Sequence, residues 1–188
     1  MLTVALLLMQ LISLQSAVSP LERVRAKIAV ESVTNLTPTE LSGQYRNPSK
    51  ELINRVRPPL SGNDLYIFPD KTFVYCEWAD VMSNTVFDKG TWSFAGDILE
   101  LKSASEVTWA PHLERRFLAV RRHSQSREIL LVGIDRELQY FEEKAGDDAE
   151  LMLLIVGRQR DRTINQAETP KIKTKLMREG WRPEFFRD

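Results

Sequence analysis

Short runs of β-branched and aromatic residues alternate with turn residues between positions 64 and 133. Runs at 65–68 and 72–78 flank a Pro-Asp-Lys turn, and runs at 90–94 and 98–102 flank an Ala-Gly-Asp turn. Each pair predicts a β-hairpin. In the second hairpin, apolar and polar positions alternate with a period of two, which is typical of antiparallel strands that cover a core with one face.

Further runs extend this series on both sides. They lie at 43–45, 116–121, 128–133, 137–141 and 151–156, and no long helix is expected between them. This order disfavours a parallel α/β sheet, whose strands alternate with helices. The sequence therefore predicts a mainly β fold: an antiparallel up-and-down barrel, or a strongly curved sheet, of about 8–9 strands.

Helix signals stand at both ends of the series. The tetrapeptide Thr-Pro-Thr-Glu at 37–40 is a capping box with proline at the first position, so a short helical turn is expected there. Residues 47–63 predict a long loop with one brief helix at 51–56. Near the C-terminus, Thr169 and Pro170 begin a helix that Gly180 ends. The apolar face of that helix consists of Ile172, Leu176 and Met177.

The first 19 residues carry no charged side chain, although the chain has 26 basic and 26 acidic residues. Positions 2–14 are almost continuously apolar and small residues follow, which is the layout of a secretory signal peptide. An N-terminal anchor and a buried helix are the alternatives, but at ~1.5 Å per residue positions 2–18 are short for a ~30 Å hydrocarbon core. We therefore expect an exported protein, periplasmic or extracellular, with no membrane span after removal of the leader.

Four segments follow from these patterns. They are a signal peptide or anchor at 1–19, a linker or short helix at 20–40, a barrel domain at 41–158, and a C-terminal helix and tail at 159–188. We expect a monomer.

The formal net charge is zero, which argues against a nucleic-acid binder, because such a protein depends on a basic surplus. Cys76 is the single cysteine, so no disulfide can form within the chain. Charge is nevertheless uneven, with arginines concentrated at 115–127 and acidic segments on either side. Either adjacent strands exchange ion pairs, or the arginines rim a site for an anion.

The tripeptide Gly43-Gln44-Tyr45, placed after a short helical turn, resembles the Gly-x-Trp opening of lipocalin-like (calycin-type) barrels. Lipocalin-like domains of exported bacterial proteins show similar later motifs, and the resemblance covers positions 41 to about 156. It implies that Tyr45 packs under a cation that follows the last strand, for which Arg158 is the candidate. The later motifs are Asp-Lys-Thr-Phe at 70–73, Gly90-Thr91-Trp92, and the alternating run at 96–101. Gly43, Tyr45, Gly90, Trp92 and Arg158 are thus expected to be structural.

Barrels of about eight strands either enclose one small ligand or are filled by their own side chains. Our leading hypothesis is non-enzymatic binding of a small apolar, amphipathic or anionic ligand. The alternative is a periplasmic or cell-surface protein–protein interaction module with a solidly packed barrel, and the third is an enzyme of unknown class. The candidate ligand contacts are Phe73, Tyr75, Trp78, Arg116 and Arg121.

The sequence shows no catalytic motif and no cofactor motif. His112 and Glu114 would share one face of a strand, but the arginines that follow oppose a cation site there. We therefore expect no metal and no cofactor.

Overall fold

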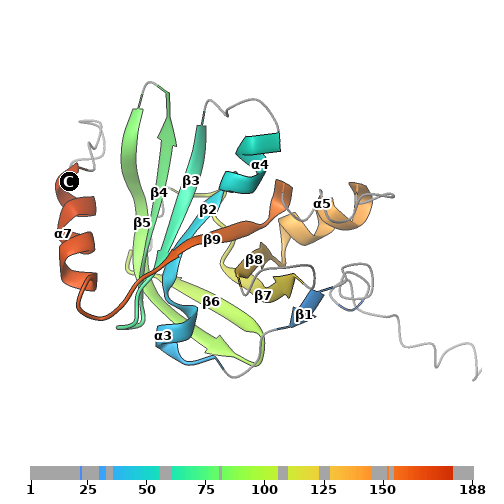
Figure 1. Ribbon diagram of the computed structural model, residues 1–188, viewed down its shortest axis with the longest axis horizontal. Coiled ribbons are helices and arrows are strands. Elements are labelled where there is room, and N and C mark those ends of the chain that lie inside the picture. Colours follow the sequence, from blue (N-terminus) through green and yellow to red (C-terminus); the bar gives the residue numbers. More distant parts are fainter. Residues whose placement is uncertain are drawn as a thin grey trace, which may run out of the picture.

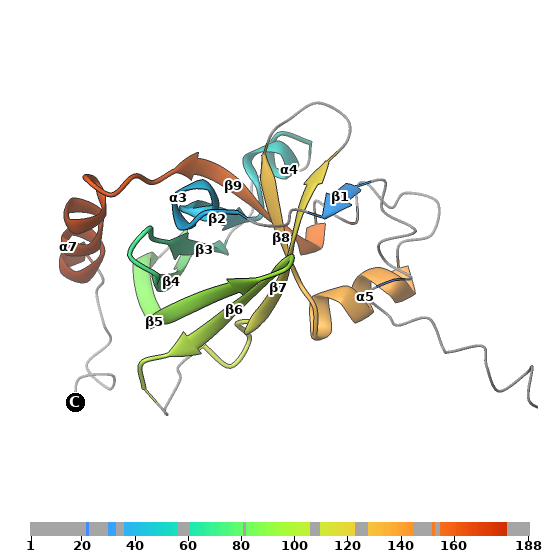
Figure 2. The same ribbon diagram turned by 90° about the horizontal axis from the view of Figure 1, so that it is seen from below.

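Eight antiparallel strands close into a barrel in the computed structural model, which describes residues 22, 30–32, 36–55, 61–80, 82–105, 110–122, 128–144, 152 and 155–179. The strands follow the order β7-β6-β5-β4-β3-β2-β9-β8, and β8 pairs back with β7 (Figures 1 and 2). The bounds are β2 Gly43–Asn47, β3 Ser61–Ile67, β4 Thr72–Ala79, β5 Met82–Ala95, β6 Ile98–Ser103, β7 Arg116–Arg122, β8 Ile129–Gly133 and β9 Arg158–Thr163. The predicted antiparallel barrel is confirmed.

A ninth strand, β1 (Val30–Ser32), continues the edge of β7 where β6 ends. β6 pairs with residues 116–118 of β7, whereas β1 pairs with residues 120–122. Part of the segment expected to be a linker therefore belongs to the sheet. The predicted leader at 1–19 lies outside the described residues.

Strand alternation divides the buried side chains between the inside and the outside of the barrel. The inside is an apolar core that includes Tyr45, Leu65, Phe73, Trp92 and Phe117. Because neighbouring positions point outward, β3 and β4 carry a second apolar cluster, and β7 and β8 carry a third.

Helices cover these outer clusters. The helices are α3 Pro38–Leu41, α4 Lys50–Arg55, α5 Arg136–Lys144 and α7 Thr169–Glu179. α7 lies beside β4 and β5, where Leu176 packs into the outer cluster, and α5 lies by β7 and β8 at the other side of the barrel (Figures 1 and 2). The predicted C-terminal helix is confirmed. No helix in the described part of the chain is long and apolar enough to cross a membrane.

Two predicted strands are wrong. Residues 137–141 belong to helix α5, and the described residues of 151–156, namely Met152, Ile155 and Val156, are helical. Met152 and Val156 are apolar because they cover the outer face of β7 and β8. The closing strand is the polar segment β9, which extends the barrel to Thr163.

Candidate functional site

The two ends of the barrel differ in chemistry. At one end, α3 closes the barrel with Leu41 and Tyr45, both with no exposed surface. The Tyr45 hydroxyl donates to the carbonyl of Leu41 at 2.6 Å, and burial raises the pKa of this phenol far above its usual range. The Thr37–Glu40 capping box that holds α3 is present as predicted. This end is filled by the protein's own side chains.

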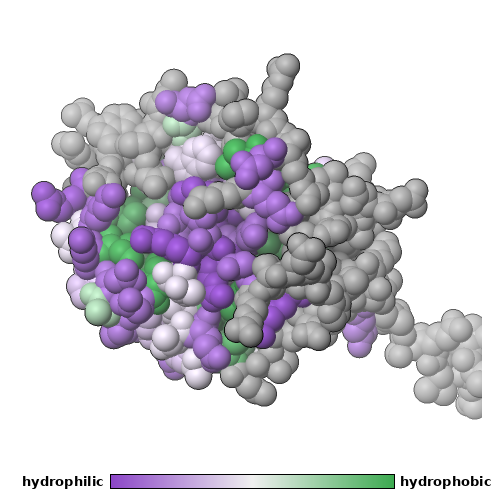
Figure 3. All heavy atoms as spheres, viewed as in Figure 1, coloured by the Kyte–Doolittle hydropathy of each residue, from purple (hydrophilic) through white to green (hydrophobic). Residues whose placement is uncertain are grey.

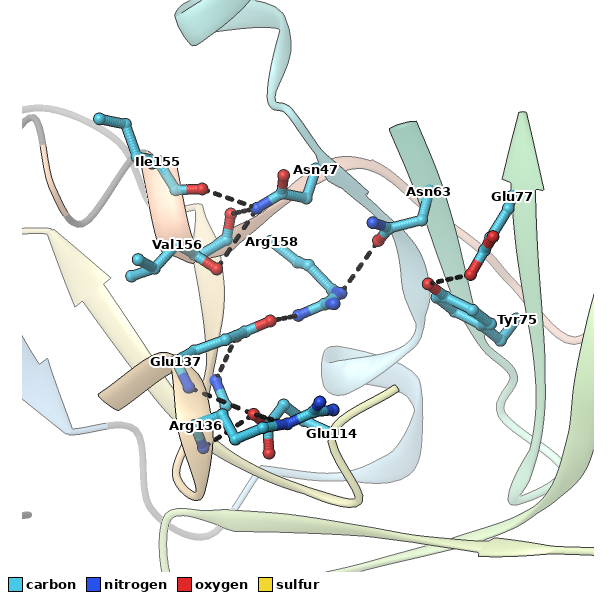
Figure 4. Close-up of polar contacts among 12 residues, drawn as sticks. Asn47, Asn63, Tyr75, Glu77, Glu114, Arg136, Glu137, Ile155, Val156 and Arg158 are labelled. Carbon is cyan, nitrogen blue, oxygen red and sulfur yellow. Dashed lines mark hydrogen bonds and ion pairs between the residues drawn. The ribbon is translucent and has the colours of Figure 1, made fainter. Parts of the chain in front are cut away.

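Polar side chains converge inside the barrel at the opposite end, which we call the α5 end (Figure 4). At its centre is Arg158, the first residue of β9, with only 4% of its side chain exposed. Its Nη1 donates to Oε1 of Glu137 at 2.5 Å, and its Nε donates to Oδ1 of Asn63 at 3.2 Å. The guanidinium also lies over the Phe117 ring, 5.2 Å from the ring centre. Arg158 is therefore held in one position by two strands of the barrel, β3 and β7, and by α5.

Helix α5 supplies the carboxylate of this pair, and Glu114 holds the start of the helix. Oε1 of Glu114 accepts the backbone N–H of Arg136 at 2.8 Å and that of Glu137 at 3.2 Å. The second oxygen of Glu137 accepts the N–H of Gly133, at the end of β8, at 2.7 Å. The backbone N–H of Gly133 thus orients the carboxylate that fixes Arg158, and Glu114 fixes the first turn of the helix that carries it.

The charge of Arg158 persists at every physiological pH. Burial by itself lowers the pKa of this guanidinium, but the nearby charges of Glu137 and Glu114 and the hydrogen bond to Glu137 outweigh burial and raise the pKa. Arg158 is therefore a permanent buried cation.

Tyr75 and Glu77 of β4 face the same space. The Tyr75 hydroxyl donates to Oε1 of Glu77 at 3.0 Å. Burial raises the pKa of Tyr75 far above its usual range, and Glu77 and Glu137 add to that effect despite the opposing charge of Arg158. The phenol is therefore neutral and acts as a donor to Glu77.

Several polar atoms of this group have no hydrogen-bond partner among the described residues. They are Nη2 of Arg158, Nδ2 of Asn63 and Oε2 of Glu77. None of them is among the fully buried unpaired atoms of the described chain, which are Trp78 Nε1, Gln159 Oε1 and Arg160 Nε. These two donors and one acceptor at the α5 end are therefore not fully buried.

The charges here do not favour an anion. Arg136 and Arg158 stand against Glu77, Glu114 and Glu137, so the local sum is 2 − 3 = −1. An uncharged head that both donates and accepts hydrogen bonds fits this set better than a carboxylate does.

The structure separates the residues expected to contact a ligand. Tyr75 belongs to the α5 end, whereas Phe73 is 1% exposed and packs deeper in the apolar core. Trp78 is the cross-strand partner of Gly62, and a Cβ on Gly62 would meet the indole ring. Because Asp64 and Cys76, two residues further along the paired strands, face outward, Trp78 lies outside the barrel.

Arg116 and Arg121 do not rim one opening. They lie near opposite ends of β7, about 16 Å apart at ~3.3 Å per residue. Nη2 of Arg116 donates to Asp135 at 2.6 Å on the outer surface. For Arg116, the alternative of surface ion pairs between adjacent strands therefore applies. The expected arginine rim is therefore not formed by this pair.

The pairing of Tyr45 with Arg158 that the resemblance implies is not the one observed. Arg158 lies over Phe117, whereas Arg160 is the residue opposite Tyr45 in the β2–β9 pairing. A Cβ on Gly43 would stand 2.6 Å from Cδ of Arg160, so glycine leaves room for this arginine. Trp92 Nε1 donates to the carbonyl of Phe68 at 2.9 Å in the core.

Gly90 also allows a close approach. A Cβ there would overlap the backbone carbonyl of Lys102 on the neighbouring strand β6. The predicted structural use of Gly90 therefore has a physical basis.

Sequence reasoning missed Asn63, Glu77 and Glu137, and it considered Glu114 only as a metal ligand. Arg158 lies 95 residues from Asn63 and 21 from Glu137, so no local pattern marks these two partners, whereas Glu77 lies two residues from Tyr75 on the same strand. Within the described residues no group of three His, Cys, Asp or Glu side chains could hold a metal ion, and His112 is exposed.

No protein-family model, no curated protein sequence and no solved structure matches the chain. The structure itself defines the class of protein, an eight-stranded antiparallel barrel with an external C-terminal helix. The lipocalin-like resemblance stays a prediction.

Proposed function

We propose that the protein binds a small amphipathic molecule with an uncharged, hydroxylated head at the α5 end of the barrel. The observation that carries this proposal is the set of unpaired polar atoms on Asn63, Glu77 and Arg158, which face the inside of the barrel above an apolar core. A hydroxyl group both donates and accepts, so one hydroxylated head can satisfy all three.

The packing of the barrel interior limits how deep the ligand enters. Phe73, Leu65 and Phe117 are each no more than 1% exposed and occupy the deeper interior. The apolar part of the ligand would therefore lie above these side chains, against the ring of Tyr75. We propose binding without catalysis, on an exported protein, in line with the leader-like segment at 1–19.

The protein-interaction alternative depends on an exposed apolar face of the C-terminal helix. Ile172 and Leu176 instead pack against the outer cluster of β3 and β4, and Met177 alone of the three is exposed, by 44%. The described part of the C-terminal helix therefore gives no support to this alternative.

Octyl β-D-glucoside below its micellar concentration is a suitable probe, and octanoate is the matched anionic compound. By titration calorimetry we expect the glucoside to bind and octanoate to bind at least about ten-fold more weakly at this end, because the local charge is negative. Tyr75→Phe and Glu77→Gln should each weaken glucoside binding about ten-fold, since each alters a hydrogen bond that involves a charged group.

Glu100→Gln is the matched control, because Glu100 is exposed on β6 and faces away from the core. It should bind the glucoside as the unmodified protein does. Unchanged affinity in both Tyr75→Phe and Glu77→Gln would refute the proposed site. Native mass spectrometry of protein purified from its own host would then identify a retained molecule directly.

A further inference from the structure

A separate hollow lies outside the barrel, between α7 and strands β4 and β5. Its volume is about 420 Å³, within the ~300–1,000 Å³ range of small-molecule sites. Val74, Gly90 and Ala104 contribute apolar surface, and Met177 of α7 lines the opposite wall with 44% of its surface exposed. Apolar surface is visible between α7 and these strands, bordered by hydrophilic side chains (Figure 3).

Two lysines line this hollow from opposite walls. Lys173 of α7 is held in place, because its Nζ bonds to Asp70 at 2.5 Å and lies 5.0 Å from the centre of the Phe68 ring. Lys89 of β5 is exposed, and its ammonium group has no hydrogen bond or ion pair with any residue in the described part of the chain. With Asp70 counted, the local charge is 2 − 1 = +1.

We infer that this hollow is a second binding site, and that it takes a small amphipathic anion such as an alkyl carboxylate. The carboxylate would pair with Lys89, whose ammonium group has no partner among the described residues, and the alkyl chain would lie along Val74 and Met177. Thr72 and Thr91 also line the hollow.

Charge and size select this ligand class. A neutral amphiphile would leave the ammonium of Lys89 unpaired, and a cationic one would be repelled by both lysines. A docking protein would cover about 800 Å² on each partner, whereas the hollow has the volume of one small molecule. The site lies outside the barrel wall, so it is independent of the ligand proposed for the α5 end.

Methionine-methyl NMR can observe this site directly, because Met177 lines it. The protein would carry ¹³C-methyl methionine, and Met177→Leu would assign the Met177 resonance. We expect decanoate to shift that resonance in a saturable way, while decanol and decyltrimethylammonium bind at least about five-fold more weakly. Lys89→Ala should weaken decanoate binding about five-fold, as expected for loss of an exposed ion pair.

Lys171→Ala is the matched control. Lys171 of α7 is exposed, as Lys89 is, but it lines a different hollow, beside Pro170 and Lys175. Decanoate should bind this variant as it binds the unmodified protein. Tyr75→Phe should leave decanoate binding unchanged too, which separates this result from the test of the α5 end.

Three outcomes would overturn the inference. The first is a Met177 resonance that does not move with decanoate. The second is equal affinity for decanol and decanoate, and the third is unchanged affinity in Lys89→Ala.

Discussion

Replacing Arg158 by methionine should cost more stability than replacing any surface arginine. The side chain of Arg158 is 4% exposed, and its partner Glu137 is 20% exposed. Removal of one member of a buried ion pair costs ~3–5 kcal/mol, because the other charge remains buried without compensation. Glu137 keeps the N–H of Gly133 and some solvent, so we expect the lower end of that range, about 3 kcal/mol.

Glu137→Gln should cost at least as much, because the charge it leaves behind is the more deeply buried one. The double variant Arg158→Met/Glu137→Gln leaves no unpaired charge, so the two single costs should not add. We expect a coupling free energy of about 2 kcal/mol, at the upper part of the range for residues in one network.

Urea unfolding followed by tryptophan fluorescence measures these differences, because Trp92 lies in the core. The control is the exposed pair of Arg116 and Asp135, whose side chains are 52% and 43% exposed. Arg116→Met should cost only ~0–1 kcal/mol. If Arg158→Met cost no more than Arg116→Met, the account of Arg158 as a buried structural cation would be refuted.

Four further outcomes test other parts of the structure. Cys76 has no exposed surface and burial raises the pKa of its thiol, so Ellman's reagent should label it slowly in native protein and fast in urea; fast native labelling would contradict its burial. Thr37→Ala removes the hydroxyl that caps α3 and should cost ~1 kcal/mol in the same urea assay, where no loss would mean that the cap is not needed. Gly90→Ala should lower the free energy of unfolding by ~1–3 kcal/mol, because the new methyl group overlaps the backbone of β6. An unchanged free energy of unfolding would show that the two strands can separate there. Burial raises the pKa of Asp70, but hydrogen bonds from Lys173 and a neighbouring threonine outweigh burial and hold this pKa below its ordinary value. The pair should therefore stabilise the fold above about pH 4 and lose that effect as the pH falls further. In Lys173→Ala the free energy of unfolding should fall less steeply with decreasing pH in this acidic range.

Hydrophobic alternation was sufficient to predict strands that pack one face on the core. The hairpins of β3 with β4 and of β5 with β6 follow this rule, since Leu65, Tyr75 and Leu99 point inward while their neighbours point outward. The turn residues between these strands are local signals as well. This part of the barrel could therefore be predicted from sequence.

Helix α5 could not be predicted in the same way. Leu138 and Tyr140 alternate as in a strand, but Leu138 is buried and Tyr140 is 49% exposed on a helix. The helix begins where Glu114 accepts the N–H groups of Arg136 and Glu137, 22 and 23 residues away. A cap supplied from so far along the chain leaves no signal next to the helix.

Strand β9 was missed because its inward positions are arginines. Arg158 and Arg160 lie two residues apart and occupy sites where the pattern requires apolar residues. The predicted contact of Tyr45 with Arg158 therefore differs from the observed position of Arg160 by two residues. Residues two positions apart in a strand share a face. An arginine therefore still faces Tyr45, but it is Arg160 and not the predicted Arg158.

The same two arginines explain why the ends of the barrel differ. Arg160 reaches the end of the barrel that helix α3 closes, where its Nη1 donates to the carbonyl of Glu40 at 2.6 Å. Arg158 reaches the α5 end, where its partners Glu137 and Asn63 leave Nη2 without a hydrogen-bond partner among the described residues. A buried cation must be surrounded by acceptors, so the polar character of the α5 end follows from placing Arg158 in the closing strand. If the double variant Arg158→Met/Glu137→Gln folds and still binds octyl glucoside with unchanged affinity, the head of the ligand is held by Asn63 of β3 and Glu77 of β4, and Arg158 serves closure of the barrel and not recognition.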